Sequence, residues 1–240
     1  MIVGDEADGM ATFVLVHGAW SGSWGYTKTA RLLRAQGHEV WTPSLTGLGE
    51  RSHLSSPAIT LDTHIQDVAN VFAYEDLTDV ILVGHSYGGM VIAGVSAKCA
   101  DRIRTLVYLD AFLPTDGQAL WDIAGEHGQS FYIEGQRNTP GLISPMGIAA
   151  TPENADLAAT RRRKLDLHPL LTLTQPVRLD GSEKAIKRRT YILATKRPGF
   201  QRFYDQVKDD PAWTAKTIDT GHVVMMEDPE GLARLLAEEA

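Results

Sequence analysis

The sequence predicts an α/β fold in which helices cover both faces of a doubly wound, mainly parallel sheet. Four apolar β-forming residues follow one another at 80–83, without the polar alternation of a strand that has one solvated face. Similar short runs occur at 12–16 and 103–109, and helical segments separate the three. This alternation is typical of a parallel sheet, in which ligands bind at the carboxyl ends of the strands.

The stretch Gly84-His-Ser86-Tyr-Gly88 lies between the apolar run at 80–83 and an apolar helix expected at 90–99. A strand, a tight glycine-containing turn and a helix form the context of a nucleophile elbow, which lifts a serine hydroxyl out of the sheet. The hydroxyl then lies at a helix N-terminus, where developing negative charge is stabilised. An ordinary surface turn would lack this context, so Ser86 is the candidate nucleophile.

The other core elements follow from apolar spacing and capping residues. A helix that Ser23 can cap is expected to stop at Gly37, and a long loop is expected around 47–57. A last helix should begin at Asp228-Pro229, because proline is favoured in the first helical turn. The remaining expected elements are a helix from Thr60 with apolar residues at Leu61, Ile65, Val68 and Phe72, a helix around 200–207, and strands at 40–41, 190–194 and 213–218.

The 240 residues can form one large domain with an insertion. We expect an N-terminal tail at 1–10, an α/β core formed by 11–111 and 188–240, and an inserted helical cap at 112–187. The cap is expected because its segment is rich in Pro, Gly and short amphipathic pieces and has no sustained strand signal.

Composition excludes several classes of protein. Cys99 is the only cysteine, which rules out an intrachain disulfide and a cysteine-rich metal site, and no metal or other cofactor is expected. The net charge of −7 opposes nonspecific binding to nucleic acid. The N-terminus has no signal-peptide pattern and no run is long enough to span a bilayer, so we expect a cytoplasmic protein without membrane contact. The oligomeric state stays open.

A serine hydroxyl needs a base within hydrogen-bond reach, and the base needs a carboxylate to orient it. His222 is the candidate base because it follows the last expected strand on a short glycine-led loop, whereas His85 is expected to point away from Ser86. Asp110 is the candidate acid, since it ends the strand expected beside the elbow strand, about 4.8 Å away. Asp110 could instead merely cap a turn, and the alternative acids are Asp205 and then Asp219.

Acyl transfer also needs hydrogen-bond donors for a tetrahedral oxyanion, each worth about 3 kcal/mol. The backbone N–H of Tyr87, directly after the serine, and that of Ala19, after the first strand, are the candidates.

Three stretches carry a family resemblance: Phe13-Val-Leu-Val-His-Gly-Ala-Trp20, Gly84-His-Ser-Tyr-Gly-Gly-Met90 and Val107-Tyr-Leu-Asp-Ala-Phe-Leu-Pro114. The sequence resembles the alpha/beta hydrolases, in particular the plant salicylate methyl esterase and hydroxynitrile lyase branch and its bacterial esterase relatives. The resemblance implies the alpha/beta hydrolase fold with a Ser, acid, His order. Plant members carry the acid after the next-to-last strand, where this chain has 195–197 without an acid.

We therefore expect a cofactor-free serine carboxylesterase that hydrolyses a small-molecule ester through an acyl-enzyme. A lyase acting on cyanohydrins, or cleavage of C–C, lactone or amide bonds, is an alternative on the same triad. The resemblance disfavours the lyase, because its threonine and lysine positions hold Gly18 and Val223 here. A noncatalytic ligand receptor on the same scaffold is a further alternative.

Aromatic and aliphatic residues of the cap are candidates for the substrate pocket. They are Phe112, Leu113 and Trp121, with Trp20 opposite them, and the same residues could equally form the core of the cap. The basic run 161–164 could attract an acidic substrate, but a solvated face of a cap helix is the preferred interpretation.

Overall fold

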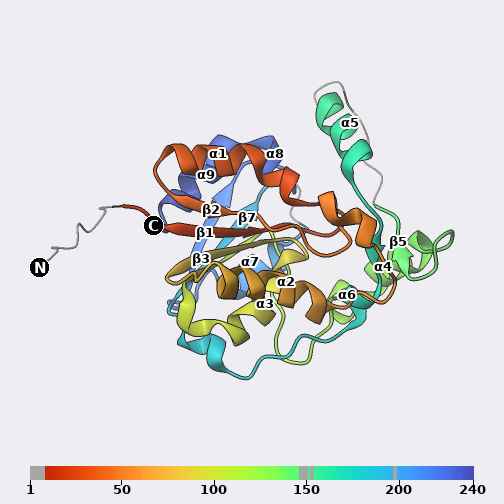
Figure 1. Cartoon of the computed structure of the whole chain (residues 1–240), viewed down its shortest axis with the longest axis horizontal. Helices are drawn as coiled ribbons and strands as arrows, with labels where there is room; N and C mark the ends of the chain where they lie inside the picture. The colour runs from red at the N-terminus through yellow and green to blue at the C-terminus, as the bar shows by residue number, and fades with distance from the viewer. Residues whose placement is uncertain (1–8, 146–150, 152–153, 197–198) are drawn as a thin grey trace, which may run out of the picture.

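The computed structural model describes residues 9–145, 151, 154–196 and 199–240. Its centre is a parallel sheet of six strands in the order β2-β1-β3-β4-β7-β8, which confirms the predicted fold class (Figure 1). The strands are β1 (Thr12–Val16), β2 (Glu39–Trp41), β3 (Val80–His85), β4 (Ile103–Leu109), β7 (Arg188–Ala194) and β8 (Thr214–Ile218).

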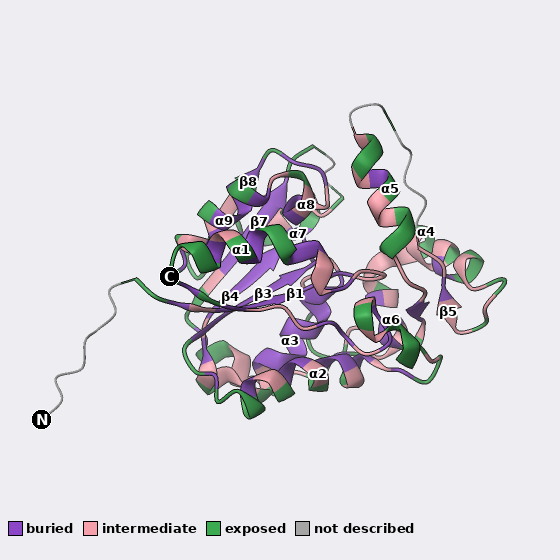
Figure 2. Ribbon diagram, turned by 45° about the horizontal axis from the view of Figure 1, so that its top comes forward, coloured by how far each residue is buried: buried purple, intermediate pink, exposed green. Residues whose placement is uncertain are grey.

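Helices cover both faces of this sheet. On one face lie α1 (Thr27–Ala35), α8 (Val224–Glu227) and α9 (Pro229–Ala237), and on the other lie α2 (Leu61–Tyr74) and α3 (Gly88–Lys98), with α7 (Gln201–Val207) following β7 (Figure 1). Alternate residues of β1 and β3 belong to the two separate hydrophobic clusters, because successive side chains of a strand point to opposite faces. β3 is buried throughout, and β1 and β4 are buried except at Thr12 and Arg104 (Figure 2).

Local capping explains several helix boundaries. Thr60 and Thr63 form a reciprocal capping box at the start of α2, and the Asp228 carboxylate accepts a hydrogen bond from the Gly231 N–H at the start of α9, with Pro229 in the first turn. The expected role of Ser23 is wrong. It is the first residue of a 3₁₀ helix, η1 (Ser23–Tyr26), that has no side-chain cap.

The segment between β4 and β7 adds smaller elements, most of which lie beside the carboxyl edge of the sheet (Figure 1). They are α4 (Leu120–Gly135), β5 (Leu142–Ile143), α5 (Ala155–Lys164), β6 (His168–Pro169), α6 (Leu171–Thr174) and the 3₁₀ helix η5 (Ser182–Ala185). β5 and β6 form a short antiparallel pair, and α5 stands out from the body of the molecule (Figure 1). The segment 49–54 in the expected long loop forms η2 (Gly49–Leu54).

In the part of the chain that the structure describes, no helix combines the length and the apolar character that a membrane span requires.

Close backbone contacts fix the turn between β3 and α3. A Cβ atom at Gly84 would lie 2.6 Å from the carbonyl oxygen of Gly88, and one at Gly88 would lie 2.8 Å from that of Val16. A Cβ atom at Gly89 would overlap the carbonyl oxygen of Phe112. These glycines let α3 pack directly against β1 and the residues after β4.

Replacing Gly89 by alanine is predicted to lower the free energy of unfolding by at least about 2 kcal/mol, because backbone atoms cannot move aside as a flexible side chain does. Urea denaturation measures the change. Gly199→Ala is the matched control, since apart from its chain neighbours no described residue has an atom within 4 Å of a Cβ atom at that position. Equal stability of the two variants would contradict the close packing at Gly89.

Candidate active site

Ser86 occupies a strained position directly after β3. Its φ of 55° lies in the left-handed region, which residues other than glycine rarely adopt. The Ser86 N–H donates to the carbonyl of Leu109 at 3.3 Å, and the Ser86 carbonyl accepts from Gly89 at 3.0 Å and from Phe112 at 3.1 Å. Three backbone hydrogen bonds thus hold the turn that projects the hydroxyl beyond the edge of the sheet.

His222 reaches the hydroxyl of Ser86 from the loop after β8. Its Nε2 lies 3.0 Å from Ser86 Oγ, and its side chain is 33% exposed. The ring of Phe200 stacks on the imidazole with 4.9 Å between the centroids and 6° between the planes. This stacking restricts the orientation of the imidazole.

Asp110 lies on the other side of the imidazole and is completely buried. Its Oδ2 is 2.6 Å from His222 Nδ1, and its Oδ1 accepts a hydrogen bond of 3.1 Å from the N–H of Ala194 at the end of β7. Both carboxylate oxygens therefore have donors, as a buried charge requires.

The alternative acids lie elsewhere. Asp205 is on α7, where it contacts Gln201 and Lys208 at the surface, and Asp219 faces Thr195 and Lys196. Neither makes a hydrogen bond to His222 in the described structure, whereas Asp110 does.

The hydrogen bonds assign the tautomer of His222. A carboxylate can only accept, so the proton lies on Nδ1 and points to Asp110, which leaves the lone pair of Nε2 facing the hydroxyl of Ser86. This arrangement can take a proton from the serine and stabilise the imidazolium that results.

His85, whose side chain was expected to point away from Ser86, packs against His222. The two rings lie 4.6 Å apart, and His85 Nε2 donates to the carbonyl oxygen of His222 at 2.7 Å. Burial lowers the pKa of His85 well below its usual value, so the ring is neutral. A neutral donor holds the His222 loop without repelling a positive charge on His222.

The two candidate oxyanion donors belong to residues near Ser86. Tyr87 directly precedes α3, and Ala19 lines the cavity beside Ser86. The loop that carries Ala19 passes close to Ser86, since a Cβ atom added at Gly18 would lie 3.0 Å from Ser86 Cβ. Among the hydrogen bonds of the described residues, none uses the N–H of Tyr87 or Ala19. Both donors therefore remain available for a ligand.

His17 holds the loop that carries Ala19. Its Nδ1 donates to the Gly18 carbonyl at 2.8 Å, and its Nε2 accepts from the N–H of Leu45 at 3.1 Å. Burial lowers the pKa of His17 to about 4, partly offset by its hydrogen bond to Gly18. The ring is thus a neutral structural clamp at neutral pH.

The same loop is tied to the segment between β4 and β7 through Trp20, whose φ is 62°. The Trp20 N–H donates to His168 Nδ1 at 3.3 Å, its carbonyl accepts from Asp166 at 2.9 Å, and its indole Nε1 donates to the carbonyl of Ile143 at 2.9 Å. The position of the Ala19 amide therefore depends on the loop after β1 and on the segment between β4 and β7.

A mainly apolar cavity opens beside Ser86. Trp20 lines it, and Phe112, Leu113 and Trp121 are not among its described lining residues. The residues that line the cavity are His17, Gly18, Ala19, Trp20, Ser21, Trp24, Gly25, Tyr26, His85, Ser86, Arg161, Leu165, His222, Val223, Met225 and Met226.

Phe112, Leu113 and Trp121 make packing contacts outside this cavity. The ring of Phe112 meets those of Phe200 and Phe203, and the ring of Trp121 lies 6.2 Å from that of Tyr132. Leu113 lines a different hollow. These contacts are compatible with the alternative interpretation of the three residues, as packing residues of the cap, and their role in the substrate pocket stays a prediction.

Sequence reasoning missed the part of the cavity wall that Trp24, Met225 and Met226 form. Trp24 follows a glycine and serine loop, and the methionines lie three and four residues after His222, so proximity to predicted site residues was the available signal. Arg161 also lines the cavity, although the run 161–164 was expected to form a solvated face.

The parallel sheet, the sharp turn at Ser86 and the contacts of Ser86 with His222 define the class to which this chain belongs. A model described as the alpha/beta hydrolase family matches residues 13–235. The chain is a member of that family.

Comparison with individual proteins narrows the class. The chain is 42% identical over 239 residues to a carbendazim hydrolyzing esterase of Nocardioides sp. (strain SG-4G), with 95% of this chain and 99% of that protein covered. It is 28% identical over 253 residues to methyl jasmonate esterase 1 of Vitis vinifera, with 94% and 95% covered. The structure of an extracellular alpha/beta-hydrolase from a Paenibacillus species matches with a TM-score of 0.80 and 25% identity, covering 96% of this chain and 99% of that one. This chain is a hydrolase acting on ester bonds.

Acid is predicted to destabilise the fold through its buried histidines. Burial lowers the pKa of His17 and of His64 from 6.5 to about 4, so between these values the unfolded chain binds more protons than the folded protein. The free energy of unfolding should therefore fall as the pH drops from 6.5 to about 4, by up to about 3 kcal/mol for each ring.

Urea denaturation at about pH 7.5, 5.5 and 4.5 measures this dependence. His53→Gln is the control, because His53 is exposed and should leave the slope unchanged. A free energy of unfolding that stays constant over this range would contradict neutral burial of His17 and His64.

Proposed function

We propose that the chain is a serine carboxylesterase in which Ser86, His222 and Asp110 form the catalytic triad. The observation that carries the proposal is the placement of one imidazole 3.0 Å from the Ser86 hydroxyl and 2.6 Å from the Asp110 carboxylate. A serine next to such a base is activated as a nucleophile without a cofactor.

In the acylation step, Ser86 Oγ attacks the ester carbonyl carbon while His222 Nε2 takes the hydroxyl proton. The carbonyl oxygen becomes an oxyanion, which the N–H groups of Ala19 and Tyr87 bind, at about 3 kcal/mol for each donor. The C–O bond to the alcohol then breaks, and His222 returns the proton to the leaving alcohol.

Water completes the cycle. His222 takes a proton from the water as its oxygen attacks the acyl carbon. The bond to Ser86 Oγ then breaks as His222 donates the proton to this oxygen, which releases the carboxylic acid and restores Ser86. Throughout, Asp110 keeps the tautomer of His222 and stabilises its positive charge.

The apolar wall of the cavity supports a small organic ester as substrate. Trp20, Trp24 and Met225 supply aromatic and aliphatic surface, and the relatives are named for hydrolysis of carbendazim and of a methyl ester. We propose that 112–187 acts as a cap over this cavity, because residues of this segment form hydrogen bonds with Trp20, on the loop that carries Ala19. The cytoplasmic location expected from the sequence stays a prediction.

Cyanohydrin cleavage is the second candidate, because an alpha-hydroxynitrile lyase of Arabidopsis thaliana is 35% identical over 103 residues, which is 42% of this chain. Val223 lines the cavity where the resemblance places the lyase lysine, so no cation faces a cyanide leaving group from that position. Cyanide release from a cyanohydrin separates the lyase from the esterase. A noncatalytic receptor would neither cleave an ester nor react at Ser86.

Substitution of the triad is predicted to abolish ester hydrolysis. With 4-nitrophenyl acetate, Ser86→Ala and Asp110→Asn should each lower kcat by about 10³-fold to 10⁴-fold, because the variants lose the nucleophile or the correct tautomer of His222. Asp205→Asn is the matched control and should retain the activity of the unmodified protein, since Asp205 lies at the surface of α7.

A serine-directed organophosphonate provides an independent readout, because mass spectrometry of the labelled peptides locates the modified residue. Modification of Ser86 is expected. Full activity of Asp110→Asn, loss of activity in Asp205→Asn, or absence of label at Ser86 would contradict the proposed triad.

A further inference from the structure

Arg161 places a cation in the wall of the catalytic cavity. It belongs to the face of α5 that also contains Ala158 and is continued by Leu165, whereas Arg162, Arg163 and Lys164 are exposed. Ala158, Arg161 and Leu165 share one face of the helix because they are three and four positions apart. Within the basic run 161–164, the first residue therefore faces the cavity and the other three face solvent.

The guanidinium of Arg161 has no carboxylate partner among the described residues. Glu227 lies near enough to act on it electrostatically, but its carboxylate accepts a hydrogen bond of 2.7 Å from the N–H of Gly221. No described Asp or Glu lines the cavity. Burial lowers the pKa of Arg161, and the charge of Glu227 offsets only part of this effect.

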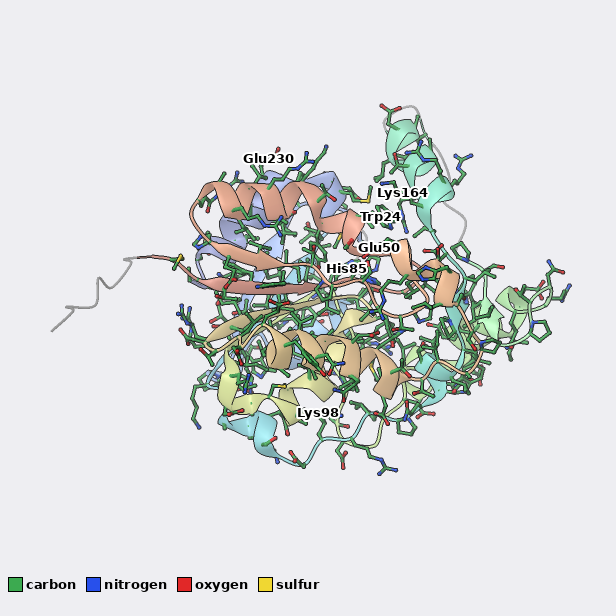
Figure 3. All side chains as sticks on the ribbon, in the orientation of Figure 1. Trp24, Glu50, His85, Lys98, Lys164 and Glu230 are labelled. Carbon is green, nitrogen blue, oxygen red and sulfur yellow. The ribbon has the colours of Figure 1, made fainter. Side chains whose placement is uncertain are left out.

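A groove between α5 and α1 continues from the cavity, with which it shares Trp24, Gly25, Met225 and Met226. Lys28, Arg31 and Lys164 line the groove, where Asp156 is the single described acid. Figure 3 shows Lys164 and Trp24 facing one another, and the Lys164 ammonium lies 5.3 Å from the centre of the indole ring.

The groove is therefore basic on a chain whose net charge is −7. Positive charge lining an approach to a cavity attracts anions and raises their local concentration. The unpaired cation inside the cavity and the basic groove outside it favour the same kind of ligand.

We propose that Arg161 is a specificity-determining residue and that the preferred ester carries a second, carboxylate group distant from the bond that is cleaved. This inference rests on the proposed esterase function. Ser86 would attack the ester carbonyl while the guanidinium of Arg161 binds the free carboxylate with charge-assisted hydrogen bonds. A neutral ester would leave Arg161 desolvated and unpaired, which lowers its affinity.

The test compares half-esters of dicarboxylic acids with neutral esters of matched length. The 4-nitrophenyl half-esters of succinic, glutaric and adipic acid provide three distances between carboxylate and ester, and 4-nitrophenyl butyrate, valerate and hexanoate are their neutral partners. Rates are corrected for uncatalysed hydrolysis. We expect at least one half-ester to exceed its neutral partner in kcat/KM by about tenfold, mainly through a lower KM.

Arg161→Gln should reduce the ratio of kcat/KM for the half-ester to that for the neutral ester by about tenfold, and Arg161→Lys should retain part of it. Arg163→Gln, an exposed change of the same type on the same helix, should leave the ratio unchanged. Added salt should lower the ratio in the unmodified protein, because ions screen the basic groove.

Absence of a preference for any half-ester, or an unchanged ratio in Arg161→Gln, would overturn this inference. Hydrolysis of the neutral esters that depends on Ser86 would then still support the esterase. Failure to hydrolyse any of the six esters, with no phosphonate label on Ser86, would reject the esterase itself.

Discussion

The contact between the buried carboxylate of Asp110 and His222 is the interaction on which the rest of the site depends. The register of the sheet creates it, since β3 and β4 pair with His85 opposite Leu109. The next residues, Ser86 and Asp110, therefore leave neighbouring strands side by side. Each has a positive φ, which turns its chain away from the sheet. Ala194 at the end of β7 then supplies the second hydrogen bond to Asp110.

Buried neutral histidines hold the loops around this contact. His17 fixes the loop that contains Ala19, His85 fixes the carbonyl of His222, and His168 accepts the N–H of Trp20. His17 and His168 must be neutral to accept the N–H groups of Leu45 and Trp20, because an imidazolium has no free lone pair. His85 acts as a donor, and burial keeps its ring neutral. The acid sensitivity of the fold and the precision of the site therefore have a common origin in these rings.

The core was predictable from sequence because its signals are local. Unbroken apolar runs define the strands, and glycine spacing around Ser86 defines the turn, so the carboxyl edge where Asp110 and His222 lie could be deduced. The pocket was less predictable because docking of 112–187 decides which side chains face inward. Phe112, Leu113 and Trp121 have aromatic or aliphatic character suited to either role, and only tertiary packing distinguishes the roles. The division of the basic run 161–164 into one inward and three exposed residues has the same origin.

The most direct measurement is a crystal structure of the protein after reaction with a serine-directed phosphonate that mimics the tetrahedral intermediate. Our account predicts phosphorus bound to Ser86 Oγ, a phosphonyl oxygen within hydrogen-bond distance of the Ala19 and Tyr87 N–H groups, and His222 Nδ1 still bound to Asp110. Phosphorus on another residue, or a His222 ring separated from Asp110 in the adduct, would contradict it.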